Sequence, residues 1–173
     1  EYQSPVLVGG DAEGGSAVFT VDYYYGQKAF LATSPQFYKQ IMVGPFERVF
    51  TIAKVFRAEK HATTRHISEV VQMDFEMGFI ESHRDVIGVL EKTVKDVVRA
   101  VGEKHADILK RFNTTLPLVP NTFPLLTLRE AQEILGVAEA SDLEPEQERA
   151  ICEWAKEKHQ SDFIFITHFP TAK

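Results

Sequence analysis

The sequence predicts an α+β domain built on a mostly antiparallel sheet flanked by helices. Strand-like segments fill the first half of the chain, helical ones follow, and a late apolar segment is expected to return to the sheet, an order typical of this class. The chain has 173 residues, 44% of them apolar and 25% charged, which is enough to bury a core. We therefore expect a folded domain rather than a disordered or fibrous chain.

The first half of the chain predicts paired strands and one short helix. Residues 17–33 hold two runs rich in Tyr and Phe that are divided by Gly-Gln, the composition of a hairpin. Residues 34–45 open with Ser-Pro and close with Gly-Pro, which predicts a short helix between these signals. Residues 48–57 and 69–81 are rich in β-branched and aromatic side chains and predict two long strands joined by a large polar loop.

The second half predicts helices and a last strand. Between residues 85 and 112 apolar side chains recur every three or four positions, which predicts one long amphipathic helix. Residues 127–136 begin with a Thr-x-x-Glu capping box and end in Gly, and residues 145–159 predict a further helix. The apolar run 162–167 predicts a buried strand.

Charge, hydropathy and cysteine content limit the class of protein. The formal net charge of −6, from 25 acidic and 19 basic side chains, argues against bulk attraction to nucleic acid, so such a contact would need a local patch. Apolar runs are far shorter than the roughly 18 to 20 residues that cross a bilayer. The single cysteine, Cys152, cannot form an internal disulfide. We expect a cytoplasmic protein with no membrane partner. Because the chain lacks an initiator Met and ends just after a strand-like run, we also expect a piece of a longer protein.

The polar loop between the two long strands is dense in charged and imidazole side chains. They are Arg57, Glu59, Lys60, His61, Arg65 and His66. The planar fork of arginine matches phosphate oxygens bidentately, and a position at a strand end holds that fork in place. We expect Arg57 to bind one phosphate while Arg65 and His66 reach others. Composition alone favours a solvated hairpin tip over a phosphate site.

These residues also resemble a known family. Residues 56–59 (FRAE), 64–66 (TRH) and 74–77 (DFEM) closely resemble motif 2 of class II aminoacyl-tRNA synthetases, in the form of the aspartyl and asparaginyl subgroup. Three more matches follow the family's order and spacing. Ser4-Pro5 resembles the end of motif 1, Glu13-Gly14-Gly15 the flexible amino-acid loop of archaeal-type enzymes, and residues 34–40 (SPQFYKQ) the aspartyl signature.

The resemblance implies a partial catalytic domain. Motif 1 would end near residues 1–8, with the amino-acid loop at 9–19, motif 2 at about 48–81 and a helical insertion at about 83–160. Motif 3, its acidic metal ligands and the amino-terminal anticodon-binding domain are absent from the chain. The resemblance therefore also implies that the chain alone is inactive and holds no metal ligands of its own.

The resemblance assigns roles to individual residues. For ATP, Arg57 would hold the α-phosphate and the reacting carboxylate, Glu59 the adenine amino group, and Arg65 and His66 the outer phosphates. Magnesium would offset the remaining phosphate charge. For L-aspartate, Glu13 and Gln36 would bind the α-ammonium group and Lys39 the side-chain carboxylate. Pro5 would lie at the interface of a homodimer.

The implied reaction is activation of aspartate to aspartyl-adenylate and transfer to the 3′ end of tRNA-Asp, with charging of tRNA-Asn left open. An asparaginyl enzyme or an adenylate-forming asparagine synthetase relative is the alternative within the fold. A non-catalytic paralogue or fragment used for dimerisation or tRNA binding is the alternative of another class. Asp74 and Glu76 share one face of a strand and would form an acidic site or pair with a neighbouring arginine such as Arg48.

Overall fold

The computed structural model describes residues 1–10, 17–59 and 67–171. The chain divides into two compact units, Glu1–Glu81 and Ser82–Lys173, and each is described by itself. No helix among the described residues is long and apolar enough to cross a membrane.

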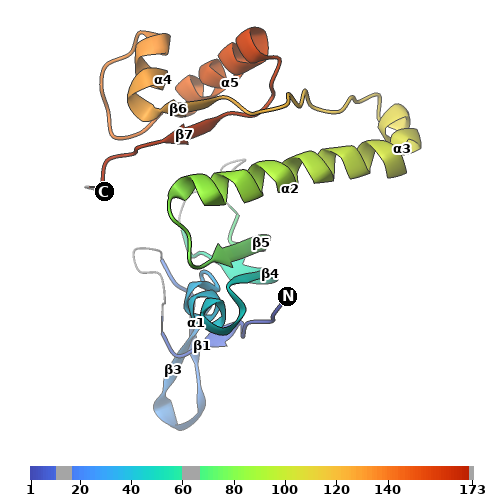
Figure 1. Cartoon of the computed structure of the whole chain (residues 1–173). Helices are drawn as coiled ribbons and strands as arrows, with labels where there is room; N and C mark the ends of the chain where they lie inside the picture. The colour runs from blue at the N-terminus through green and yellow to red at the C-terminus, as the bar shows by residue number, and fades with distance from the viewer. Residues whose placement is uncertain (11–16, 60–66, 172–173) are drawn as a thin grey trace. The chain divides into compact units, whose positions relative to one another are not determined.

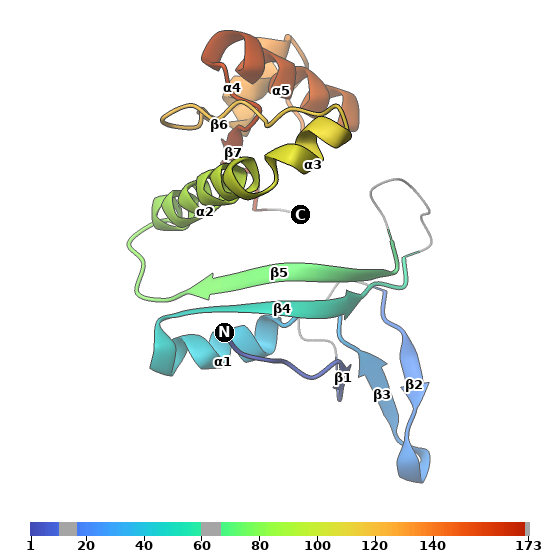
Figure 2. The ribbon, with the colours of Figure 1, turned by 90° about the vertical axis from the view of Figure 1, so that its right-hand side faces the viewer.

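A small antiparallel sheet opens the first unit. Strands β1 (Leu7–Val8), β2 (Thr20–Asp22) and β3 (Lys28–Leu31) pair in the order β1-β3-β2; Figure 1 labels β1 and β3, and Figure 2 labels all three. The turn between β2 and β3 is the short 3-10 helix η1 (Tyr24–Gly26), in which Gly26 has a φ of 68° that suits glycine. This confirms the hairpin predicted for residues 17–33.

The two long strands of the first unit are also confirmed. Strands β4 (Arg48–Phe56) and β5 (Glu69–Met77) run antiparallel along their full length (Figure 2). On β4 every second side chain, from Val49 to Val55, is buried, whereas Phe50 and Ile52 on the other face are 44% and 57% exposed. A strand's side chains alternate between faces, so β4 and β5 present one buried and one exposed face.

Helix α1 (Gln36–Phe46) packs against β4 and β5. It begins where the Ser-Pro signal predicts, and the Oγ of Ser34 accepts a hydrogen bond from the backbone N–H of Gln36 at 3.1 Å. The predicted stop at Gly44-Pro45 is two residues early, because Pro45 lies inside the last turn. At the far end, a Cβ on Gly78 would lie 2.5 Å from a Val43 methyl carbon, so glycine permits the close approach of β5's end to α1.

The second unit begins with α2 (His83–Lys104), which the Ser82 side chain caps. The single helix predicted for residues 85–112 is wrong: the chain leaves helical geometry at His105 (φ −133°) and a separate helix, α3 (Ala106–Arg111), follows. The apolar spacing fails at the break, where Gly102 and three polar residues follow Val101. Residues 113–124 then form an extended, proline-containing segment.

The apolar core of the second unit lies around β6 (Leu125–Thr127), α4 (Leu128–Leu135), α5 (Pro145–His159) and β7 (Phe165–Thr167). The capping box and Gly136 stop of α4 and the bounds of α5 are as predicted. The strand predicted at 162–167 is shorter and half-buried, and it pairs in parallel with β6 as a separate sheet instead of returning to the antiparallel strands. The buried cluster consists of Leu128, Ala131, Leu143 and Ile151.

Candidate active site

A lysine and two carboxylates meet on the buried face of the β4–β5 pair. Lys39, from the first turn of α1, places its Nζ 2.5 Å from Oδ1 of Asp74 and 3.3 Å from Oε2 of Glu76. The Nε2 of Gln72 donates to Oδ2 of Asp74 at 2.9 Å. Because Asp74 lies opposite Thr51 in the ladder, these groups share the face that α1 covers. We call Lys39, Gln72, Asp74 and Glu76 the lysine cluster.

The lysine cluster is largely shielded from solvent. The side chains of Lys39 and Asp74 are 12% and 8% exposed. Burial by itself lowers the pKa of Lys39, but its hydrogen bond to Asp74 and the charges of Asp74 and Glu76 outweigh that effect and raise the pKa above its usual value. Lys39 is therefore a permanent cation, and its contacts with two carboxylates account for two of its three N–H donors.

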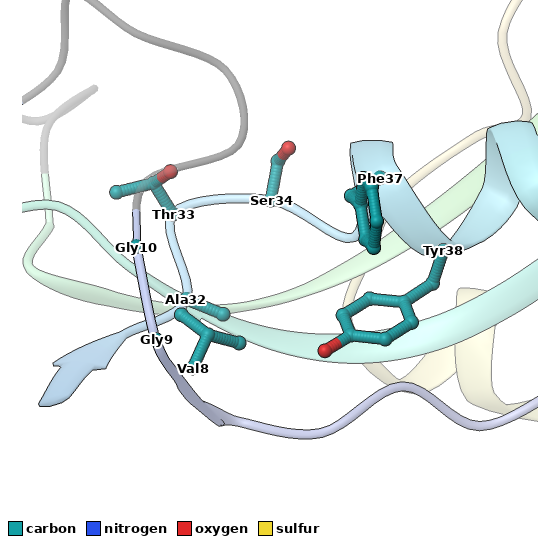
Figure 3. Close-up of a pocket in the computed structure, with 8 residues that line it drawn as sticks. All are labelled: Val8, Gly9, Gly10, Ala32, Thr33, Ser34, Phe37 and Tyr38. Atoms are coloured by element: carbon teal, nitrogen blue, oxygen red, sulfur yellow. The ribbon is translucent and has the colours of Figure 1, made fainter.

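A cavity of about 270 Å³ lies next to the start of α1. Figure 3 shows the segments 8–10 and 32–34 side by side along it, with Phe37 and Tyr38 of α1 at one end. The cavity combines aromatic rings with the hydroxyl groups of Thr33 and Ser34. Such a mixture suits a small polar ligand held by few directed hydrogen bonds.

Arg57 and Glu59 follow directly after the end of β4 and are half-buried. The backbone N–H of Arg57 donates to the carbonyl of Ser68 at 3.0 Å, and that of Ala58 to Ala17 at 2.8 Å. These bonds hold the chain on both sides just beyond the last ladder pair, Phe56 and Glu69. A guanidinium at this position is well anchored for binding an anion.

The whole chain, residues 1–173, matches the family described as "tRNA synthetases class II (D, K and N)". The chain belongs to the class II tRNA synthetases. Members of this family use ATP, and the α+β architecture with antiparallel strands is theirs.

Individual relatives agree with this assignment. The aspartate-tRNA(Asp/Asn) ligase of Deinococcus radiodurans is 42% identical over 180 residues, covering 99% of this chain and 40% of that protein. The aspartate-tRNA(Asp) ligase of Pyrococcus horikoshii is 35% identical over 177 residues, with 99% and 40% covered. The chain thus spans about 40% of the length of the curated relatives it matches.

Solved class II structures show the same fold. The asparaginyl-tRNA synthetase of P. horikoshii, complexed with asparaginyl-adenylate, superposes with a TM-score of 0.83 at 28% identity, covering 98% of this chain and 39% of that one. The aspartyl-tRNA synthetase of Entamoeba histolytica gives 0.76 at 34% identity, with 83% and 31% covered.

The synthetase residues expected from the sequence fall into three groups. Gln36 and Lys39 lie together on the first turn of α1, and Arg57 and Glu59 lie together beyond β4. Pro5 is exposed just before β1. The remaining three, Glu13, Arg65 and His66, lie outside the described residues.

The alternative in which Asp74 and Glu76 pair with Arg48 is wrong. Arg48 lies opposite Met77 in the ladder, so its side chain is on the face away from Asp74. The partner is Lys39, 35 residues away along the chain from Asp74. Within the described ranges, no group of three or more His, Cys, Asp or Glu side chains is arranged to hold a metal ion.

Two members of the neighbourhood were not anticipated from the sequence. One is Gln72, which lies two residues before Asp74 on β5 and therefore on the same face. The alternation of side chains along the strand is enough to predict this. The other is Tyr2: burial, followed by the charges of Asp74 and Glu76, raises the pKa of its phenol. No local pattern around Tyr2 predicts this position.

Proposed function

We propose that the complete protein activates L-aspartate with ATP to form aspartyl-adenylate and transfers the aspartyl group to the 3′ end of tRNA-Asp. The observation that carries this proposal is the buried ammonium of Lys39 on the first turn of α1, the turn from which Phe37 and Tyr38 line a cavity of about 270 Å³. The D. radiodurans and Thermus thermophilus relatives, both named aspartate-tRNA(Asp/Asn) ligases, support the same substrate and add tRNA-Asn as a second acceptor.

In the proposed reaction the α-carboxylate of aspartate attacks the α-phosphorus of ATP, and pyrophosphate leaves. Arg57 holds both reacting groups, Glu59 accepts from the adenine amino group, and Arg65 and His66 bind the outer phosphates. Gln36 and Glu13 hold the α-ammonium group. These groups orient the reactants and neutralise charge, so no side chain needs to act as a covalent nucleophile. Magnesium would bind with the ATP phosphates and supply further neutralising charge.

The geometry of the lysine cluster refines how aspartate is selected. Asp74 and Glu76 together give the cluster one net negative charge when Lys39 is protonated. Asparagine therefore does not leave Lys39 unpaired, and Lys39 contributes only the difference between a charge-assisted and a neutral hydrogen bond, about 1 to 2 kcal/mol or roughly fivefold to thirtyfold. Stronger discrimination requires a second cation from residues outside those described.

Pyrophosphate exchange by the complete protein, measured with aspartate and with asparagine, tests this proposal. Exchange with aspartate should exceed exchange with asparagine, and Lys39→Leu should remove most of the aspartate rate. Lys54→Leu is the matched control, because Lys54 is 60% exposed and pairs with Glu69 on the other face of β4. Equal exchange with both amino acids in the unmutated protein would contradict the aspartate assignment and favour the asparaginyl alternative. The structural likeness to the P. horikoshii asparaginyl enzyme supports that alternative.

The complete protein is also proposed to be a homodimer. Pro5 precedes β1, the edge strand of its sheet, and the neighbouring Val6 and Leu7 are 39% and 43% exposed. An exposed apolar edge strand is a surface that a second copy can cover. In this proposal residues 1–8 end motif 1, residues 48–81 form motif 2, and residues 83–160 form a helical insertion.

A further inference from the structure

The hairpin of β2 and β3 ends in three consecutive exposed tyrosines. Tyr23, Tyr24 and Tyr25 are 47%, 73% and 100% exposed. Figures 1 and 2 show the hairpin projecting from the first unit, with η1 at its free end. The rings of Tyr23 and Tyr24 lie edge to face with their centroids 5.0 Å apart, a favourable arrangement for two aromatic side chains. The tip therefore presents a preformed aromatic surface.

The turn at the tip places Tyr25 in a conformation that tyrosine does not favour. The carbonyl of Tyr24 accepts from the N–H of Gln27 at 3.2 Å, and the two central residues, Tyr25 and Gly26, have φ values of 59° and 68°. This is the pattern of a type I′ turn, in which Asn-Gly is preferred and a bulky residue is disfavoured at the first central position. Because the Tyr25 side chain is fully exposed, packing against the described residues does not offset this cost. A contact made outside the chain would explain why a tyrosine occurs here.

The charges of the hairpin favour a protein surface over a nucleic acid as the partner of this tip. Between residues 20 and 31 the only charged side chains are those of Asp22 and Lys28, which lie opposite each other in the ladder and cancel. Nucleic-acid phosphates are bound by several lysine and arginine side chains, and the tip has no such group of cations. Tyrosine, by contrast, is enriched among the residues that contribute most to protein–protein interfaces.

The tip also supplies area that the proposed homodimer needs. Strand β1, the edge strand of the same sheet, has only two residues, whereas a stable interface buries about 800 Å² on each partner. An aromatic side chain buries roughly 150–250 Å², so the exposed parts of the three tyrosines offer about 400 Å² more. Because β1 pairs only with Phe30 and Leu31, the hairpin extends past the end of β1 and is free to contact a second copy beside it.

We propose that the hairpin of β2 and β3 is an arm whose tyrosine tip packs against a second copy of this chain, next to the contact made by β1. The inference rests on the proposed function, because it takes the complete protein to be a homodimer. In a two-fold dimer the contact occurs twice, once from each copy. The arm thus completes an interface for which the β1 edge alone is too small.

Tyr25→Asn in the complete protein tests the proposal, because asparagine suits the positive φ but removes the ring. Sedimentation of a dilution series should give a dimer dissociation constant at least about thirtyfold higher, since a tyrosine contact is lost and the two-fold axis repeats the loss. Circular dichroism should be unchanged, because the turn itself is favoured. Tyr25→Phe, which keeps the ring, should stay within about threefold of the unmutated protein.

Phe112→Asn is the matched control, because Phe112 is an aromatic residue of the second unit that is as exposed as Tyr24. Its dimer dissociation constant should equal that of the unmutated protein. An unchanged dissociation constant for Tyr25→Asn would overturn the inference. So would a variant that dimerises normally but binds tRNA-Asp more weakly, because the tip would then be an RNA contact. An unmutated protein that sediments as a monomer at micromolar concentration would instead reject the proposed homodimer itself, so the two failures are distinguishable.

Discussion

Polar side chains are bonded differently in the two compact units. On the β4–β5 face of the first unit, Lys39, Gln72, Asp74 and Glu76 bond to one another, side chain to side chain. All four project from regular elements, and three of them alternate along one strand. Side-chain to side-chain bonds are the minority type in folded proteins, and none of these four is needed to satisfy a loop.

In the second unit the buried or half-buried polar groups mostly serve the backbone. The Nε2 of Gln132 donates to the carbonyl of Ala140 at 2.9 Å, and the Oγ of Ser161 donates to the carbonyl of Phe163 at 2.7 Å. A carboxylate of Glu91 on α2 accepts from the backbone N–H of Phe123 at 3.1 Å. These bonds fix irregular segments onto helices and strands.

This difference indicates that the polar groups of the first unit are suited to binding a ligand, whereas those of the second unit hold the fold together. A side chain that satisfies a loop's backbone cannot be redirected to a ligand without loosening the loop. A cluster of side chains on a rigid sheet can exchange a partner for a substrate while the backbone stays in place. Substitutions in the lysine cluster or beside it should therefore change substrate use, whereas substitutions in the second unit should change stability.

The largest expected effect belongs to Arg57. Arg57→Ala in the complete protein should lower pyrophosphate exchange by about a thousandfold or more, because charge stabilisation of a reacting phosphoryl group is lost. Circular dichroism and the melting temperature should change little. Arg48→Ala is the control, since Arg48 is exposed at the other end of β4, nine residues before Arg57. Near-normal exchange by Arg57→Ala would remove the assignment of this loop to ATP.

A core substitution in the second unit should have the next largest effect. It should lower the stability of the fold and leave pyrophosphate exchange nearly unchanged. Ile151 is 2% exposed within the cluster formed with Leu128, Ala131 and Leu143, so Ile151→Ala should lower the free energy of unfolding by about 3 kcal/mol. Denaturant titration measures this loss, and Ile134→Ala, at a 40% exposed position of α4, should lose under about 1 kcal/mol. Exchange per folded molecule should stay within about twofold. A large loss of pyrophosphate exchange in folded Ile151→Ala would contradict the view that the second unit affects stability and not substrate use.

Local signals in the sequence predicted most elements of both units. The capping box from Thr127 to Glu130, the Ser-Pro start of α1 and the bounds of α5 all depend on neighbouring residues, and the structure has them where expected. Strand β6 was missed because three residues after a proline-containing segment have no pattern of their own. They become a strand only by pairing with β7, 40 residues later.

The candidate site was predictable only in part, for the same reason. Motif resemblance supplied Lys39, Gln36, Arg57 and Glu59, but the contact between Lys39 and Asp74 joins a helix to a strand that lies 35 residues further on. If the register of β4 and β5 had been known, the alternation of side chains would have excluded Arg48 as the partner of Asp74. The backbone N–H of Tyr2 bonds to the carbonyl of Phe50 on β4, a contact that no spacing in the sequence encodes.

The smallest expected effect concerns Asp162, which serves the backbone of the second unit. Its Oδ2 accepts from the N–H of Leu118 at 2.6 Å, its Oδ1 lies 3.0 Å from Nζ of Lys156, and its own N–H donates to the Leu118 carbonyl. The hydrogen bond from Leu118, and then that from Lys156, lowers the pKa of the Asp162 carboxyl group below its usual value. The ionised form is therefore favoured in the folded chain.

A lowered pKa fixes the direction of the pH dependence. The stabilisation by Asp162 is fully present above the unfolded-state pKa of about 3.9 and is lost as pH falls through the lower folded-state value. Asp162→Asn keeps an oxygen acceptor for Leu118 but loses the charge, so at pH 7 it should cost about 1 kcal/mol, a value reduced by the partial exposure of the pair to solvent. Denaturant titrations between pH 7 and pH 2 should show the two proteins converging as the carboxyl group protonates. Glu157→Gln, an exposed charge change on the same helix as Lys156, should show no such convergence. A difference between wild type and Asp162→Asn that stayed constant down to pH 2 would mean that shape, and not charge, makes this side chain hold residues 113–124 in place.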